Sequence, residues 1–282
     1  ATFVMSAAIR SAEFFELVAA SGRHVSRTHT SGLDELRISL NVLERARPPR
    51  TLLSRQGPLY ASAGRPIVTV PAASTVVELH ALSPSDASVT RAMQSLARFL
   101  PAVGAPTGGS LPNPGPNESS TALWIRADQV RVLLGSDLEK GSNALTGWRG
   151  VIGSETPPDG AHVYKVAHHG SKNAHHDEIW TRLCSPEPIA LLTPFLSSRL
   201  PRGADVERLQ ARTPHVFCAS DPAPRAKPSA RPPEVERTIR DAARRRRVLS
   251  PHMGQVRVRL PIAGGAPPRV ELFGAARALR RT

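Results

Sequence analysis

Short apolar segments rich in Val alternate with segments of helical periodicity along the middle of this 282-residue chain. The stretches "RPIVTV" (65–70) and "STVVELHAL" (74–82) are short and Val-rich, which predicts strands. The next stretch, "SPSDASVTRAMQSLARFL" (83–100), places its apolar residues near helical spacing and predicts a helix. Because strands that alternate with helices pack in layers, the sequence predicts an α/β layered fold.

The same alternation continues towards the C-terminus. The stretch "TALWIRADQVRVLL" (121–134) predicts two strands joined by a tight turn at 127–129, and "HVYKVAHH" (162–169) predicts a strand that ends at two histidines. Further helices are expected at 10–23, 33–46, 174–184, 203–212 and 234–247. Further strands are expected at 188–195 and 215–220, with a closing hairpin of strands at 255–260 and 269–274.

Two Pro-rich segments interrupt this pattern. Residues 101–116 are rich in Pro, Gly, Ser and Asn, which predicts an irregular surface loop, and residues 221–233 predict a Pro-rich linker or lid. The basic C-terminal helix and the closing hairpin follow at 234–282. We interpret residues 1–282 as one domain. Because its opening, "ATFVMSAAIR", is typical of the inside of a domain, we expect the chain to be a fragment or its true start to lie upstream.

Positive charge is concentrated in the last third of the chain. The net charge is +14; residues 1–198 carry 18 Lys and Arg against 16 Asp and Glu, whereas residues 199–282 carry 19 against 7. A basic surface of this kind binds nucleic acid or another phosphate-bearing polyanion through counterion release. The alternative is codon bias, since 33 of the 37 basic residues are Arg, as a GC-rich genome favours. A solvated basic face is the common outcome, and both interpretations stay open.

The cysteines and the apolar residues bear on the compartment. Cys184 and Cys218 are too few and too far apart for a disulfide framework or a zinc knuckle, which predicts free thiols in a reducing cytoplasm. No run of eighteen apolar residues occurs, so no membrane span is predicted. The sequence also has no basic-then-apolar signal pattern at its start. A cytoplasmic location is the expectation.

The first candidate for chemistry is Asp137, which follows an apolar strand in "VLLGSDLE". A strand that ends in Gly-x-Asp places a carboxylate at the edge of a sheet, where ligands bind in α/β folds. The alternative is structural, because Asp137 could cap a short helix that begins at Leu138.

The second candidate is the pair His168 and His169 at the end of the strand at 162–169. Gly170 allows a sharp bend close to a ligand, and Ser171 can hydrogen-bond the site or start the next element. Imidazoles together with a carboxylate suit Zn²⁺ or Mn²⁺. A lone histidine pair is more often structural, and either ring or both could face the pocket.

His175 and His176 are expected in the first turn of the helix at 174–184. We interpret them as rim residues that face a substrate.

The order of these motifs resembles the C-terminal half of the metallo-β-lactamase fold. It is most similar to the hydrolases related to the soluble domain of the DNA-uptake competence protein. The resemblance rests on an Asn-x-x-Ser segment before a hairpin (Asn117 with Ser119 or Ser120), on the Gly-x-Asp that ends at Asp137, and on "KVAHHGS" at 165–171. It covers roughly residues 60–275 and implies an αβ/βα sandwich that is incomplete at the N-terminus and lacks its N-terminal strands.

The resemblance implies a metal-dependent hydrolase of the phosphodiesterase or nuclease type that uses one or two Zn or Mn ions. Asp137 would bridge the metals and His169 would bind one of them, with His168 as the alternative ligand. Asn117 and Ser171 would orient the ligands or touch phosphate.

The family's first metal motif, His-x-His-x-Asp-His, is absent from these residues; "GRHVSRTHTSG" (22–32) has a different spacing. The chain is therefore expected to be either a truncated piece of an active enzyme or a degenerate member. In the second case a non-catalytic scaffold would use its Arg-rich C-terminus to bind nucleic acid or a protein partner. A hydrolase for a small ester or lactone is a third possibility.

Overall fold

A computed structural model describes residues 4–10, 38, 42, 59–72, 75–97, 117–154, 160–221, 232–242, 253–262 and 266–280. The predicted loop at 101–116, nearly all of the predicted helices at 10–23 and 33–46, and most of the linker at 221–233 lie outside these residues. Among the described residues, no helix is long and apolar enough to cross a membrane.

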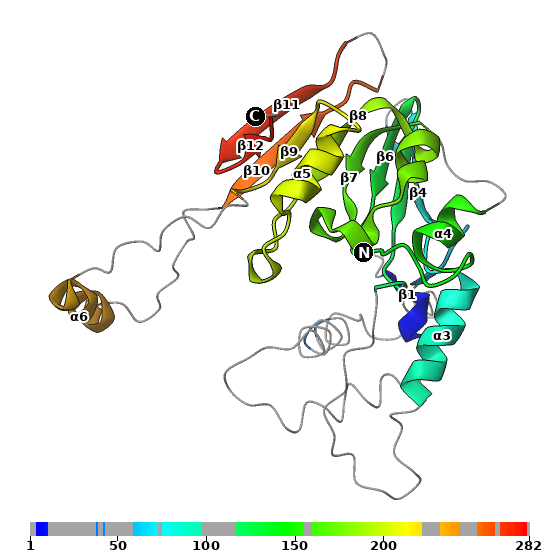
Figure 1. The fold of residues 1–282 in the computed structure, drawn as a ribbon, viewed down its shortest axis with the longest axis horizontal. Helices are drawn as coiled ribbons and strands as arrows, with labels where there is room; N and C mark the ends of the chain where they lie inside the picture. The colour runs from blue at the N-terminus through cyan, green and yellow to red at the C-terminus, as the bar shows by residue number, and fades with distance from the viewer. Residues whose placement is uncertain are drawn as a thin grey trace, which may run out of the picture.

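An eight-stranded mixed sheet forms the centre of the protein, with the strand order β12-β9-β8-β7-β6-β5-β4-β3 (Figure 1). Its strands are β3 (Pro66–Ala72), β4 (Thr75–Ala81), β5 (Leu123–Ala127), β6 (Val130–Leu134), β7 (Ala161–Lys165), β8 (Cys184–Leu192), β9 (Val216–Cys218) and β12 (Arg277–Ala278). The pairs from β3 to β6 are antiparallel, and the pairs from β6 to β9 are parallel.

Two smaller sheets accompany the central one. They are the parallel pair β1 (Val4–Ser6) and β2 (Leu59–Ala61), and the antiparallel hairpin β10 (Gly254–Arg259) and β11 (Arg269–Gly274). The α-helices are α3 (Asp86–Ala97), α4 (Gly147–Ile152), α5 (Gly203–Gln210) and α6 (Pro233–Ala242). The predicted α/β class is therefore confirmed, as are the hairpin of β5 and β6 and the closing hairpin of β10 and β11.

The core lies where helical segments cover the parallel half of the sheet. Leu133 of β6 and Tyr164 of β7 are fully buried beneath Trp148 of α4, Trp180 of the next helical segment and Leu209 of α5. The three aromatic rings meet edge to face, with Tyr164 between the two indoles at centroid distances of 6.2 and 5.2 Å. Aromatic residues are scarce in the chain, and three of them pack together here. Their packing forms a rigid core beneath the loops that follow β6 and β7.

The segment predicted as a helix at 174–184 is helical over 177–183, but most of it is not α-helical. A π-helical turn occupies Ile179–Leu183, and Cys184 already begins β8. His175 and His176 precede this turn, so the expectation that they lie in the first turn of a helix is wrong. Ile179, Trp180 and Leu183 are all buried, and the wider π turn lets these closely spaced apolar residues reach the core together.

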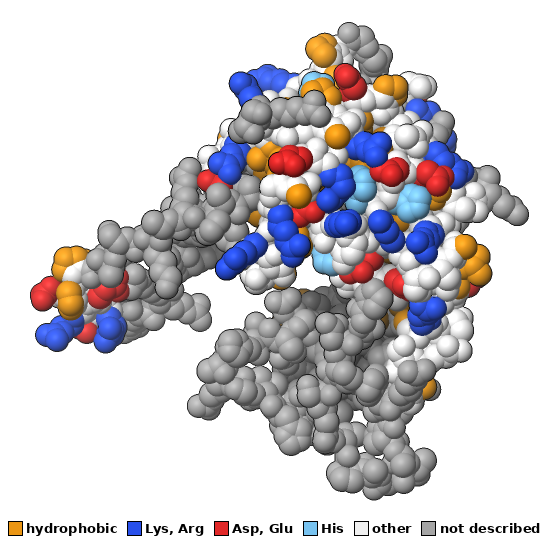
Figure 2. All heavy atoms as spheres, in the orientation of Figure 1, with side chains coloured by type: hydrophobic (Ala, Val, Ile, Leu, Met, Phe, Trp, Pro, Cys, Tyr) orange, Lys and Arg blue, Asp and Glu red, His pale blue; other side chains and the backbone are white. Residues whose placement is uncertain are grey.

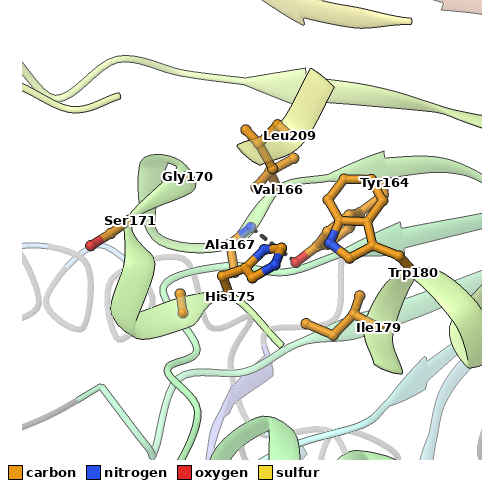
Figure 3. A pocket seen from close by; sticks show the side chains of 10 residues that line it. Tyr164, Val166, Ala167, Gly170, Ser171, His175, Ile179, Trp180 and Leu209 are labelled. Atoms are coloured by element: carbon orange, nitrogen blue, oxygen red, sulfur yellow. Dashed lines mark hydrogen bonds between the residues drawn. The ribbon is translucent and has the colours of Figure 1, made fainter. Parts of the chain in front are cut away.

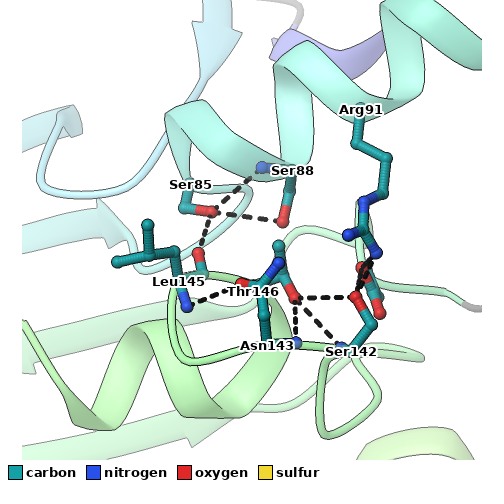
Figure 4. A network of polar contacts seen from close by, with 8 residues as sticks. Ser85, Ser88, Arg91, Ser142, Asn143, Leu145 and Thr146 are labelled. Atoms are coloured by element: carbon teal, nitrogen blue, oxygen red, sulfur yellow. Dashed lines mark hydrogen bonds and ion pairs between the residues drawn. The ribbon is translucent and has the colours of Figure 1, made fainter.

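A polar network joins α3 to the loop that precedes α4 (Figure 4). The carboxylate of Glu118, whose side chain is 6% exposed, lies 3.2 Å from Arg91 of α3 and accepts a hydrogen bond from the Ser142 hydroxyl at 3.3 Å. The Ser85 hydroxyl, just before α3, donates to the Leu145 carbonyl at 2.6 Å. The loop at 135–146 is thereby tied to a neighbouring helix at its far end.

Candidate functional site

The loops that follow β6 and β7 meet at one edge of the sheet. Because the two strands are parallel, their carboxyl ends point the same way. The Gly135 N–H donates to the Lys165 carbonyl at 2.9 Å, and the His168 N–H donates to the Ser136 carbonyl at 2.8 Å. The carboxylate-bearing loop and the histidine-bearing loop are therefore held together by main-chain hydrogen bonds on both sides of the contact.

The absence of a side chain at Gly135 makes this contact possible. A Cβ atom there would lie 2.8 Å from the Cβ and the backbone nitrogen of Ala167, well inside van der Waals contact. The glycine of the Gly-x-Asp motif is thus required by the close approach of two backbones.

The turn after β7 runs through three consecutive residues in the left-handed region: His168 (φ 44), His169 (φ 56) and Gly170 (φ 82). For the two histidines this conformation costs roughly 1–3 kcal/mol each, and such strain concentrates at functional sites. The buried Tyr164 hydroxyl lies beneath the turn and accepts a hydrogen bond from the Ala167 N–H at 3.3 Å (Figure 3).

Asp137 and His169 face each other across this junction. The Nε2 atom of His169 lies 3.7 Å from Oδ1 of Asp137. The Nδ1 atom of His169 lies 2.9 Å from the Thr193 carbonyl oxygen, at the end of β8. Because a carbonyl only accepts, Nδ1 carries the proton, and in the neutral ring Nε2 keeps a lone pair directed towards the carboxylate.

Such an arrangement suits a cation between the two groups. Zn²⁺ binds imidazole nitrogen and carboxylate oxygen at about 2.0–2.2 Å, so one ion can reach both atoms across a gap of 3.7 Å. A metal-binding histidine usually donates its second ring N–H to a backbone carbonyl, as His169 does to Thr193. No helix begins at Leu138; the next one, α4, starts at Gly147, so the capping alternative for Asp137 is not realised.

The described residues supply two metal donors at this place and not three. No group of three or more His, Cys, Asp or Glu side chains with the spacing of a metal site occurs in the described part of the chain. A catalytic zinc normally has three protein ligands, so the pair fits as part of a metal centre and does not complete one. His24 and His29 lie outside the described residues.

His168 points elsewhere from the same turn. Its Nδ1 atom lies 3.2 Å from Oε1 of Glu139, and both side chains are largely buried. The ring of His169, in turn, stacks on Phe195 at a centroid distance of 5.0 Å and an interplanar angle of 19°. The structure therefore brings His169, and not His168, to Asp137.

Lys165, the last residue of β7, adds a cation to the same edge. Burial lowers the pKa of its ammonium group, and the negative charge of Asp137 opposes this by raising it. The Lys165 Nζ donates to the Val166 carbonyl at 3.3 Å. Figure 2 shows further Lys and Arg side chains around histidines on the face that is turned towards the viewer.

The other predicted site residues lie apart from the pair. His175 contacts Asp177 at 3.1 Å, and burial lowers its pKa; the His176 ring accepts from the Glu178 N–H at 3.3 Å. Ser171 and His175 line a cavity of about 10 Å³ over Tyr164 (Figure 3), which is too small for an organic ligand. Asn117 is half-buried, and its backbone carbonyl accepts from the Ser120 N–H at 3.2 Å. None of these contacts brings Asn117, Ser171, His175 or His176 to the Asp137 carboxylate.

Sequence reasoning missed three residues that contact the histidines: Glu139, Thr193 and Phe195. Glu139 could have been predicted, because it is a second carboxylate two residues after Asp137 on the same loop. Thr193 contributes its backbone carbonyl, which any residue would supply, and its hydroxyl also lies 3.4 Å from the same Nδ1 atom. Phe195 reaches His169 only through the path of the loop after β8.

The fold and the site together define an α/β protein with a carboxylate–imidazole pair at the carboxyl edge of its parallel strands. Comparisons with protein-family models, with curated proteins and with solved structures found no match to this chain.

Proposed function

We propose that this chain is the metallo-β-lactamase-like body of a metal-dependent hydrolase that acts on phosphodiesters. The main observation behind this proposal is that Nε2 of His169 lies 3.7 Å from Oδ1 of Asp137, at the ends of two adjacent parallel strands. The order of the motifs along the chain supports the same family, as does a mixed sheet with parallel strands at its centre.

In this proposal Asp137 and His169 are two ligands of a Zn²⁺ or Mn²⁺ centre. The metal, when bound, supplies Lewis-acid activation of water and of the phosphoryl group. Thr193 fixes the tautomer of His169, and Phe195 shields one face of its ring from water. The Lys165 ammonium would offset negative charge that develops at the phosphate.

Hydrolysis of a generic phosphodiester tests this proposal. The purified chain is incubated with bis-p-nitrophenyl phosphate and added Mn²⁺ or Zn²⁺, beside the variants Asp137→Asn and His169→Gln. We expect metal-dependent release of nitrophenolate that falls at least about 100-fold in either variant, because each removes a ligand. Glu78→Gln, on β4, is the matched control and keeps full activity. Equal rates in all four proteins would contradict the proposal.

A second candidate function is a non-catalytic module that binds a polyanion or a protein partner. The observation that favours it is the outer face of the β10–β11 hairpin. Arg257, Arg259 and Arg269 surround the single carboxylate of Glu271 there, and Arg257 lies over the Phe273 ring at 4.9 Å. Arginine beside an exposed aromatic ring is a common combination in surfaces that bind single-stranded nucleic acid.

Binding of a single-stranded oligonucleotide at several salt concentrations separates the two functions. If the hairpin binds phosphates, replacing its three arginines by Gln lowers the slope of log affinity against log salt by about one for each phosphate that is no longer bound. Arg182→Gln, in the exposed pair with Glu178, is the control and leaves the slope unchanged. Salt-dependent binding without metal content or hydrolysis would select the module.

A further inference from the structure

His168 and His169 leave one turn towards two different carboxylates of the opposite loop. His169 faces Asp137 at 3.7 Å, and His168 faces Glu139 at 3.2 Å. The two ring centroids lie 6.2 Å apart at an interplanar angle of 65°, so the rings do not converge on one point. The junction of the two loops therefore contains two acid–imidazole pairs with different surroundings.

The His168 pair is the more enclosed of the two. The side chains of His168 and Glu139 are 21% and 15% exposed, whereas that of Asp137 is 50% exposed. The buried Nδ1 atom of His168 has no aligned hydrogen-bond partner among the described residues. The nearby Glu139 carboxylate is the charge that compensates this buried polar atom, whose desolvation is otherwise unfavourable.

The main chain holds His168 and Glu139 firmly. The His168 N–H donates to the Ser136 carbonyl at 2.8 Å, and its carbonyl accepts from the Ser171 N–H at 2.9 Å. The Glu139 carbonyl accepts from the N–H of Trp148 in α4 at 2.9 Å. The pair therefore connects the loop that leads to α4 with the turn after β7. Because both backbones are hydrogen-bonded, the pair is not free to open towards a substrate.

We propose that Glu139 is a positioning residue: its carboxylate holds the His168 imidazole, and this contact keeps the left-handed turn in the form that aims His169 at Asp137. His168 is then the anchor of the turn and not a metal ligand. This inference rests on the proposed function in one respect, namely that Asp137 and His169 are the metal-binding pair.

The strain of the turn explains why an anchor is needed. Two consecutive non-glycine residues with φ of 44° and 56° persist only where surrounding contacts over-determine them. The contacts of His169 to the Thr193 carbonyl and to Phe195 join the turn to the loop after β8, whereas His168 joins it to the loop after β6 through Glu139. Removal of the Glu139 carboxylate loosens the side-chain contact with the loop after β6, and the His169 ring then turns away from Asp137.

Nuclear magnetic resonance of the metal-free protein tests the anchor directly. The variants are Glu139→Gln, His168→Asn and their combination; Asn is chosen because it tolerates the left-handed region. Each single variant is expected to shift the ring resonances of His169, and the double variant is expected to shift them no further than either. Glu78→Gln is the matched control, because Glu78 lies 3.4 Å from His80 in another acid–imidazole pair, on β4 and away from the junction.

His169 resonances in Glu139→Gln that match those of Glu78→Gln would overturn the proposal. Additive shifts in the double variant would overturn it as well. If Glu139→Gln does not fold, Glu139→Asp takes its place, with Glu78→Asp as its control. A larger change in the His169 ring resonances in Glu139→Asp than in Glu78→Asp supports the anchor, and equal changes contradict it.

Titration with Mn²⁺ gives a second readout. Removing a residue that orients a metal ligand weakens binding about 10–100-fold, so both single variants should lose affinity in this range and the double variant should lose no more. Unchanged affinity in Glu139→Gln would contradict the anchor. A wild-type protein that binds no Mn²⁺ or Zn²⁺ would refute the proposed function, whereas the metal-free resonances would still decide the role of Glu139.

Discussion

Three contacts of different kinds fix the imidazole of His169. The Thr193 carbonyl accepts from Nδ1, Phe195 stacks on the ring, and Asp137 faces Nε2. The first contact sets the tautomer, the second restricts ring rotation, and the third places a negative charge opposite the free lone pair. In the proposed metal site these contacts would set the tautomer and the orientation of the ring.

Gly135→Ala tests whether the close contact of the loops is required. The added methyl group would meet Ala167 at 2.8 Å, so the loops must separate, and we expect a loss of about 1–3 kcal/mol in the free energy of unfolding. Gly203→Ala, at the start of α5, is the control, because nothing lies within 4 Å of its Cβ position. Urea unfolding of both variants measures the difference; equal midpoints would mean that the loops are not in contact.

Cys184 gives a prediction about pH. Burial raises the pKa of its thiol from 9.0 to about 12, so in this range the folded protein keeps a proton that the unfolded chain loses. The free energy of unfolding therefore declines as the pH rises above about 9, and Cys184→Ala removes that part of the decline. Urea unfolding from about pH 7 to about pH 10 measures the two slopes. Parallel curves for the two proteins would contradict the raised pKa.

Some residues of the site could be predicted from the sequence, and others could not. Asp137 and His169 were visible because each follows an apolar strand, and parallel strands bring their carboxyl ends together. The choice between His168 and His169 was not visible, since it depends on the left-handed turn that separates the two rings. Phe195 depends on the course of the loop after β8, which no local pattern encodes.

At the scale of elements, the loop at 135–146 is fixed at both ends. Main-chain hydrogen bonds to the β7 side hold its first residues, and the Glu118 network with Arg91 and Ser142 holds its far end (Figure 4). Lys140 adds a bond from its N–H to the Asn173 carbonyl at 2.9 Å. A loop with this many attachments presents Asp137 from a rigid frame, which a metal centre requires.

Glu118→Ala tests the far attachment. Its carboxylate is buried, so removing it leaves the guanidinium of Arg91 and the Ser142 hydroxyl without this acceptor, and we expect a loss of about 1.5–3 kcal/mol in the free energy of unfolding. Glu178→Ala removes one partner of the exposed pair with Arg182 and should cost about 0.5 kcal/mol or less. Thermal unfolding of both variants gives the comparison; a Glu118→Ala protein as stable as Glu178→Ala would show that the network contributes little.

Most strands were predictable because their Val-rich runs are short and bounded by turns. The segment at 174–184 was not, because its closely spaced apolar residues fit an α-helix in the sequence and a π turn followed directly by β8 in the structure. The early start of β8 reflects its pairing with β7, where Cys184 lies opposite Ala161. Pairing across such distances in sequence overrides local preference.

At the scale of the whole molecule, the acid–imidazole pairs and the arginine-rich surface lie on different elements. The acid–imidazole pairs lie at the carboxyl edge of the parallel strands, whereas the arginine-rich face belongs to the β10–β11 hairpin near the C-terminus. A Cβ atom on Gly254 would lie 2.5 Å from the carbonyl of Ala219, just beyond β9. The hairpin therefore starts next to the carboxyl end of β9.

The central claim is that Asp137 and His169 share a metal ion, and metal affinity tests it most directly. Isothermal titration with Zn²⁺ or Mn²⁺ compares the wild type with Asp137→Asn, His169→Gln and the double variant. The account predicts that each single variant loses at least about 10-fold in affinity and that the double variant loses little more, because one ion depends on both groups. Wild-type affinity in both single variants would contradict it.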